Sequence, residues 1–131
     1  MNKEKLTELY KQYNLTKDDV FKHQHYLIIT RSGIDKIQAV AKIQIHYEVV
    51  QCAPNFAVFK AIAHKGAATI ETFGSAFKGE NYKDGSTNSW YVAEMAEKRA
   101  MSRAVLKLTG FYEQGVFGED ESESFKNNNN K

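Results

Sequence analysis

The N-terminal part of the chain carries helical patterns. Within residues 3–13, apolar side chains recur at intervals of three and four, which predicts a short amphipathic helix. A second helix is expected to begin at Thr16, because Asp19 follows at the spacing of a capping-box partner.

A strand and a third helix are expected next. Residues 26–30 form a short apolar run that predicts a buried strand. Ser32 and Asp35 resemble a helix start, and the apolar spacing over residues 34–41 predicts a helix packed on the core.

From residue 43 the pattern changes to a period of two, which indicates a half-buried strand. Its apolar positions are Ile43, Ile45, Tyr47 and Val49. Pro54 cannot sit inside a ladder and turns the chain into a second strand over 56–64. Lys65–Gly66 is a tight-turn signal before a third strand over 67–77. The short connections predict a three-stranded antiparallel meander.

A polar loop over residues 78–89 leads into a long helix over residues 90–110. Asn88 or Ser89 is expected to cap its start, and Gly110 is placed to end it. One broad arc of the helix is small and apolar, with Ala93, Ala100, Met101, Ala104, Val105 and Leu108. On the other side, Arg99, Arg103 and Lys107 are predicted to form a basic stripe, with Ala96 among them. Such a stripe is typical of either a solvated face or a binding face.

The order of elements predicts an α+β fold with a β-β-β-α core, the long helix lying across one face of the sheet. Residues 1–118 are expected to form one domain, and the acidic, asparagine-rich residues 119–131 a disordered tail. No apolar run is long enough for a membrane span, and we expect a cytoplasmic protein. Its single cysteine, Cys52, excludes an internal disulfide and fits a reducing compartment.

Charge is informative only when the tail is separated from the rest. The net charge is +2, but 16 of the 18 basic and 12 of the 16 acidic side chains precede residue 119. The domain is therefore mildly basic, which alone does not predict nucleic-acid binding. The tail either competes with DNA for a basic groove or keeps the protein soluble.

Catalytic, cofactor and metal chemistry find little support. Residues 74–79 have glycine spacing like that of a phosphate loop, but Glu80 and Asn81 stand where lysine and serine or threonine are required. The four histidines lack metal-ligand spacing, and Cys52 has no local base to activate it. We expect a protein without enzymatic activity, metal or cofactor.

Cations and aromatic residues recur together in the last third of the chain, a combination typical of single-strand nucleic-acid binding. They are Lys78, Tyr82, Lys83, Trp90, Arg99, Arg103 and Lys107. Trp90 fits a core anchor at the helix start equally well.

The segment 96–110, AEKRAMSRAVLKLTG, resembles the A-E-x-R-A-x-x-R-A…G helix of phage single-strand annealing proteins. These are the Erf, Sak and RecT types, related to the eukaryotic mediator that anneals single strands. The order of elements over residues 25–112 also resembles that family. The resemblance implies that Arg103 contacts DNA, although Ser102 replaces a lysine that precedes this arginine in the eukaryotic relative. It further implies compensating roles for Lys98 and Arg99 and a DNA contact for Arg31, the basic residue near the first strand-to-helix junction.

Together these observations predict a protein that binds single-stranded DNA and promotes ATP-independent annealing as a homo-oligomeric ring or filament, in phage-type recombination or replication. One alternative is a single-strand binder that does not anneal and whose acidic tail docks a replication or recombination partner. Another is a small adaptor whose basic stripe meets an acidic protein.

Overall fold

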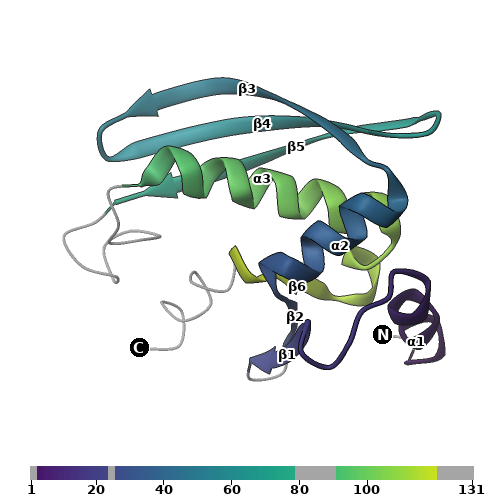
Figure 1. Ribbon diagram of the computed structural model, residues 1–131. Helices are drawn as coiled ribbons and strands as arrows, with labels where there is room; N and C mark the ends of the chain where they lie inside the picture. The colour runs from purple at the N-terminus through teal and green to yellow at the C-terminus, as the bar shows by residue number, and fades with distance from the viewer. Residues whose placement is uncertain (1–2, 24–25, 79–90, 121–131) are drawn as a thin grey trace.

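The computed structural model describes residues 3–23, 26–78 and 91–120 of the chain (Figure 1). In chain order, its elements are α1 (Lys3–Gln12), β1 (Val20–His23), β2 (Tyr26–Ile29), α2 (Arg31–Ala41), β3 (Gln44–Ala53), β4 (Phe56–Lys65), β5 (Ala68–Phe77), α3 (Val92–Thr109), the 3-10 turn η1 (Tyr112–Gln114) and β6 (Val116–Gly118). The predicted α+β fold is confirmed: an antiparallel three-stranded sheet is followed by a long helix that packs on it.

The larger sheet has the order β3-β4-β5, and both pairings are antiparallel. The turn between β4 and β5 contains Gly66, whose positive φ of 59° suits glycine. A register shift between Val49 and Gln51 places a bulge in β3. The predicted meander is therefore present, and its three strands each extend over ten residues.

A second, smaller sheet has the order β1-β2-β6. β1 pairs with β2 in antiparallel fashion, and β2 pairs with β6 in parallel. The prediction of a helix beginning at Thr16 is wrong, since residues 20–23 form β1 instead. The predicted cap contact is nevertheless made: the Thr16 amide donates to the Asp19 carboxylate at 2.9 Å. Here this contact closes a turn, because residues 20–23 pair with β2 as a strand and do not continue as a helix.

The start of α2 lies earlier than predicted. Its cap is Thr30, whose hydroxyl accepts a hydrogen bond of 3.1 Å from the Gly33 amide. Arg31, rather than a residue after Ser32, is therefore the first residue of the helix. The start of α3 is at Val92 with Tyr91 at the cap position, and the predicted caps Asn88 and Ser89 lie outside the described residues. Gly110 ends α3 in a left-handed conformation, as predicted.

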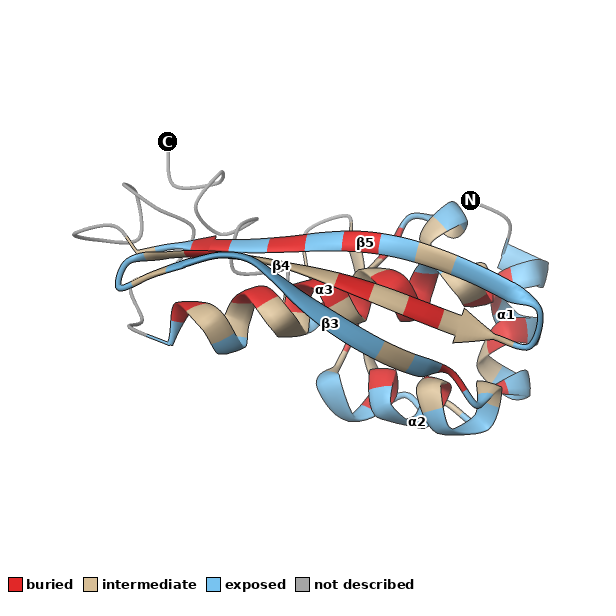
Figure 2. Cartoon of the chain, turned by 90° about the horizontal axis from the view of Figure 1, so that it is seen from above, coloured by how far each residue is buried: buried red, intermediate tan, exposed pale blue. Residues whose placement is uncertain are grey.

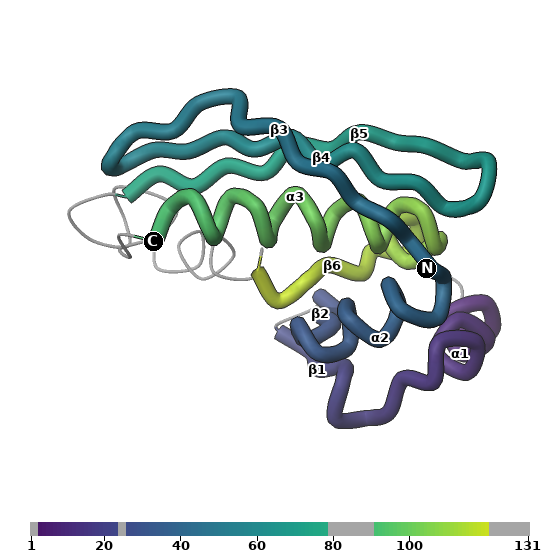
Figure 3. The backbone as a smooth tube through the Cα atoms, turned by 45° about the horizontal axis from the view of Figure 1, so that its top comes forward, coloured from purple at the N-terminus to yellow at the C-terminus, as the bar shows by residue number. Residues whose placement is uncertain are grey.

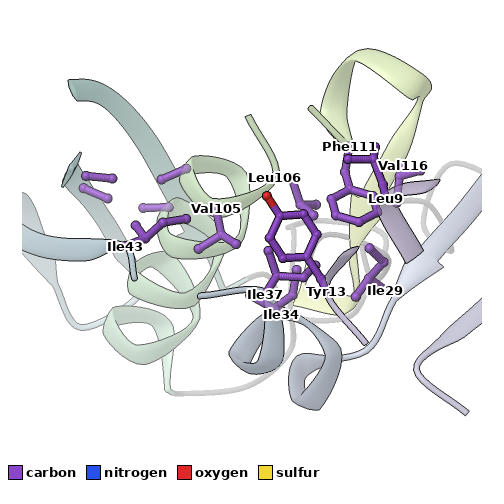
Figure 4. Packing of buried hydrophobic residues seen from close by; sticks show 14 of the residues in the cluster. Leu9, Tyr13, Ile29, Ile34, Ile37, Ile43, Val105, Leu106, Phe111 and Val116 are labelled. Atoms are coloured by element: carbon purple, nitrogen blue, oxygen red, sulfur yellow. The ribbon is translucent and has the colours of Figure 1, made fainter. Parts of the chain in front are cut away.

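α3 lies between two layers (Figures 1 and 3). One side contacts β5 and β4, and the other contacts α2 and β6. The main core lies where these layers meet α1 (Figure 4). Its labelled residues are Leu9, Tyr13, Ile29, Ile34, Ile37, Ile43, Val105, Leu106, Phe111 and Val116.

The opposite face of the large sheet is open: none of the described helices or strands covers it (Figure 2). β3 is exposed along most of its length. Tyr47 and Val49, predicted to lie on the buried side of a half-buried strand, are 38% and 60% exposed. The reason is that α3 lies on β4 and β5 and makes little contact with β3. Within the described residues, no helix is long and apolar enough to cross a membrane.

Candidate nucleic-acid interface

The packing of α3 on β5 decides where its arginines lie. Gly74 faces α3, and a Cβ atom at this position would collide with the backbone of Ala96 and Ala100. On the same face, the Thr72 hydroxyl donates a hydrogen bond of 2.7 Å to the Ala100 carbonyl. Because Gly74 meets Ala96 and Ala100, the two backbones approach closely. Longer side chains of α3 must extend beside the strand rather than beneath it.

Arg99 and Arg103 extend to the edge of β5. Arg99 donates from Nη1 to the carbonyl oxygen of Ser75 at 2.8 Å, and Arg103 donates from Nη1 to that of Phe73 at 2.8 Å. β5 is an edge strand of its sheet, so its outward carbonyls need partners other than a neighbouring strand. The two guanidinium groups therefore cover this edge and place positive charge along it.

The prediction that Arg99, Arg103 and Lys107 form a stripe opposite the packing face is wrong. Arg99 is only 4% exposed, and Ala96, placed within the stripe, is fully buried. The far side of α3 is covered too: a Cβ atom at Gly118 would lie 2.8 Å from Cβ of Ser102. One side of α3 is covered by the large sheet and the other by α2 and β6. The two arginines therefore lie between these layers, and their guanidinium groups end at the edge of β5.

The two lysines predicted on α3 lie apart from this edge contact. Lys107 is exposed, and its ammonium group is 5.4 Å from the centre of the Tyr112 ring, a cation–π contact. Lys98 is partly exposed. Neither lysine contacts the β5 carbonyls of Ser75 and Phe73, which accept hydrogen bonds from the two arginines.

Arg31, the basic residue at the junction of β2 and α2, is half exposed and ion-paired. Its Nη2 lies 2.8 Å from Oδ1 of Asp120, and its backbone amide donates to Oε1 of Glu119 at 3.0 Å. The hydrogen bond to the Asp120 carboxylate raises the pKa of Arg31 above its ordinary value, against the effect of partial burial. The guanidinium therefore carries its charge at every physiological pH.

Asp120 joins Arg31 to α3. Its carboxylate accepts from Arg31 through Oδ1 and from the Ser102 hydroxyl through Oδ2 at 3.0 Å. Its carbonyl oxygen accepts from Nε of Arg99 at 2.9 Å. The start of the predicted acidic tail is thus part of the folded domain: Glu119 and Asp120 contact it, and residues 121–131 lie outside the described residues.

Aromatic rings lie on the open face of the same edge strand. Phe73 is 51% exposed and Phe77 is 43% exposed, and the Phe77 ring contacts that of Phe56 edge-on at 6.2 Å. Residues 72, 74 and 76 of β5 point inward, so residues 73, 75 and 77 point to the open face. One strand therefore presents aromatic rings on its face and holds two arginines along its edge.

The middle of the open face is polar. The Lys60 ammonium lies 3.1 Å from a Glu71 oxygen and 4.0 Å from a Glu48 oxygen. The hydrogen bond to Glu71 and the charge of Glu48 raise the pKa of Lys60 above its ordinary value. This lysine is therefore engaged with carboxylates across three strands. Phe73 is its cross-strand partner on β5, and Phe77 lies further along, opposite Phe56.

The remaining predicted residues are only partly placed. Lys78 follows the end of β5, where its backbone amide donates to the carbonyl of Asn55 at 2.7 Å, beside the turn between β3 and β4. Tyr82, Lys83 and Trp90 lie outside the described residues. The structure thus brings Arg31 and Arg99 together at Asp120 and places Arg103 on the same strand edge as Arg99.

Three residues of this region were missed from the sequence: Phe73, Phe77 and Asp120. The signal for the two phenylalanines was present, since Thr72, Gly74 and Ala76 are small and occupy the inward positions of the strand. The large apolar side chains then fall on the outward register, which is unusual for a solvated face. Asp120 carried no such signal because its partners are distant in sequence.

Comparison with known proteins adds no relative: no protein-family model, no characterised protein and no solved structure matches the chain. Among the described residues, no group of three or more histidine, cysteine or acidic side chains is placed to hold a metal ion.

Proposed function

We propose that this protein binds single-stranded DNA and promotes annealing of complementary strands without ATP, as a homo-oligomer. The observation that carries the proposal is the composition of β5 and its edge. Arg99 and Arg103 are held at the carbonyls of Ser75 and Phe73, and two exposed phenylalanine rings project from the adjoining face. Single strands are held by cations that follow the phosphates and by aromatic faces on which bases stack.

The resemblance of residues 96–110 to the annealing-protein helix supports the annealing step. In the eukaryotic relative, the arginine that corresponds to Arg103 contacts DNA. Here Arg103 is partly exposed and donates from Nη1 to the main chain of Phe73, which holds its charge at the edge of β5. Arg99 is too buried to reach DNA while Asp120 covers it. The proposed DNA contacts are therefore Arg103, Phe73 and Phe77 at β5, followed by Arg31 at the start of α2.

The binding test uses Phe73→Ala and Phe77→Ala with a fluorescent oligothymidylate. Each substitution should weaken binding by roughly 5- to 150-fold, the range that a stacked base supplies. Phe21→Ala is the matched control, because Phe21 is a similarly exposed phenylalanine on β1 in the other sheet. Equal affinity for all three variants would remove the β5 face from the interface.

Annealing is tested separately, with two complementary oligonucleotides that carry a dye and a quencher, in the absence of any nucleotide triphosphate. The protein should accelerate pairing, and Phe73→Ala should reduce the acceleration. Binding without acceleration would identify a single-strand binder that does not anneal. Strong binding of polyglutamate, with none of DNA at low salt, would instead support the adaptor for an acidic protein.

A further inference from the structure

The first turn of α2 is built to hold an anion. Thr30 uses its hydroxyl to cap the Gly33 amide, which leaves the Arg31 amide pointing outward at the positive end of the helix. The Arg31 guanidinium lies at the same place, half exposed to solvent. A helix start of this kind favours a phosphate or a carboxylate.

Two groups of α3 converge on this place. The Ser102 hydroxyl donates to the Asp120 carboxylate, as the Arg31 guanidinium also does, and Nε of Arg99 donates to the main-chain carbonyl of Asp120. The Asp120 side chain is only 8% exposed and Arg99 only 4%, so the contact is largely screened from water. The Arg31 guanidinium, the Ser102 hydroxyl and the Arg31 amide therefore bind the carboxylates of Glu119 and Asp120, and Arg99 holds the main chain of Asp120 in place.

We propose that the carboxylates of Glu119 and Asp120 occupy the position of a nucleic-acid phosphate and compete with it, so that this acidic segment limits access of DNA to Arg31 and the first turn of α2. This inference rests on the proposed function and adds its regulation. A carboxylate and a phosphate diester each present two oxygen acceptors with a single negative charge, and both accept the same guanidinium hydrogen bonds.

The competition favours a ligand with several phosphates. Glu119 and Asp120 are covalently linked to the site, so their effective concentration is far above that of a free anion. A single phosphate cannot displace them, whereas a strand that also contacts Arg103 and Phe73 gains additional interactions.

The test compares two variants with equal charge changes. Glu119→Gln combined with Asp120→Asn removes both carboxylates but keeps their shape. Glu4→Gln combined with Glu8→Gln removes two exposed carboxylates from α1, away from the site. The first variant should bind oligothymidylate about tenfold more tightly than the wild type, the scale of a charge-assisted contact. The control should change affinity by less than about twofold at physiological salt, where distant charges are screened.

A second readout does not need DNA. Inorganic tripolyphosphate is added while the backbone amide and the side-chain Nε of Arg31 are followed by NMR. Both signals should shift in the Glu119→Gln, Asp120→Asn variant at concentrations that leave the wild type unchanged. If that variant folds poorly, Glu119→Gln alone keeps the Asp120 contacts and should give a smaller shift at the Arg31 amide.

The outcomes separate the two proposals. The proposed competition would be overturned if tripolyphosphate shifted the NMR signals neither in the Glu119→Gln, Asp120→Asn variant nor in Glu119→Gln alone. It would also be overturned if the α1 control bound oligothymidylate as tightly as the Glu119→Gln, Asp120→Asn variant. A tripolyphosphate shift without DNA binding by any form of the protein would support the anion site and refute the proposed function. Tighter DNA binding together with the shift supports both.

Discussion

The Arg103 side chain donates a hydrogen bond of 2.8 Å to the main-chain carbonyl of Phe73, the residue whose ring is half exposed on the open face of β5. This contact closes part of a sheet edge and holds a cation at the main chain of a residue whose ring is exposed. Both consequences follow from one side chain, so we expect substitutions at Arg103 to affect both stability and the proposed DNA binding. The first prediction is designed to separate these two effects.

Arg103→Gln should weaken binding of single-stranded DNA and lower the slope of log affinity against log salt by about 0.7, the value for one phosphate contact. Arg103→Lys keeps the charge and should keep the slope. Both should lower the free energy of unfolding by about 1 kcal/mol, because the bond to Phe73 is lost or weakened. Fluorescence anisotropy over a salt series and urea denaturation measure the two quantities. An unchanged slope in folded Arg103→Gln would make the arginine purely structural.

Gly74→Ala should destabilise the protein by about 3 kcal/mol. The added Cβ would collide with the backbone of Ala96 and Ala100, and neither can move without shifting α3. Ser75→Ala, at the next position but facing outward, should change stability by less than about 0.5 kcal/mol. Urea denaturation of both variants checks this. A tolerated Gly74→Ala would show that α3 does not pack closely on β5.

Asp19 should make the free energy of unfolding depend on pH in the acidic range. Hydrogen bonds from Lys36, at 2.7 Å, and from the Thr16 amide lower the pKa of its buried carboxyl. A lowered folded-state pKa means that the stabilisation is present above the unfolded value, near pH 3.9, and is lost as the pH falls through the folded value.

Asp19→Asn should therefore cost about 2 kcal/mol near neutral pH, and the difference from the wild type should shrink in acid. Asp18→Asn, at the exposed neighbouring position, should show neither effect. Thermal unfolding over a pH series distinguishes them. A pH-independent difference at Asp19 would assign its role to shape rather than to charge.

The exposed strand β3 should mediate self-association. Val49 and Val50 are 60% and 56% exposed on an edge strand, which is a template for contact with another chain. Val49→Lys and Val50→Lys together should shift the wild-type oligomer toward monomer in mass photometry. Val40→Lys, at an exposed valine of α2, is the control and should leave the assembly unchanged. A wild type that stays monomeric at micromolar concentration, with and without DNA, would contradict the ring or filament.

Local sequence patterns were sufficient for the elements whose partners are close in the chain. The period of two from residue 43, the turn at Gly66 and the stop at Gly110 all correspond to observed features. These signals depend on backbone geometry within a few residues, and the local order of apolar, polar and glycine residues indicates that geometry directly. The meander and its long helix could therefore be predicted without tertiary information.

The elements that depend on distant partners could not be predicted in this way. Thr16 and Asp19 make the contact of a helix cap, yet the next residues join β2, and β2 in turn pairs with β6 from the end of the chain. The free energy of a strand pairing depends on both partners, and a local pattern contains only one.

The sequence by itself determined that α3 is a helix with small residues and arginines, and that β5 alternates between its two faces. Only the tertiary structure decided which side of α3 the arginines take. Helical periodicity defines faces but does not say which one meets the sheet, and here both sides are covered. Close approach at Gly74 required Ala96 and Ala100 against the strand, and this brought Arg99 and Arg103 to its edge because they occupy the same side of the helix.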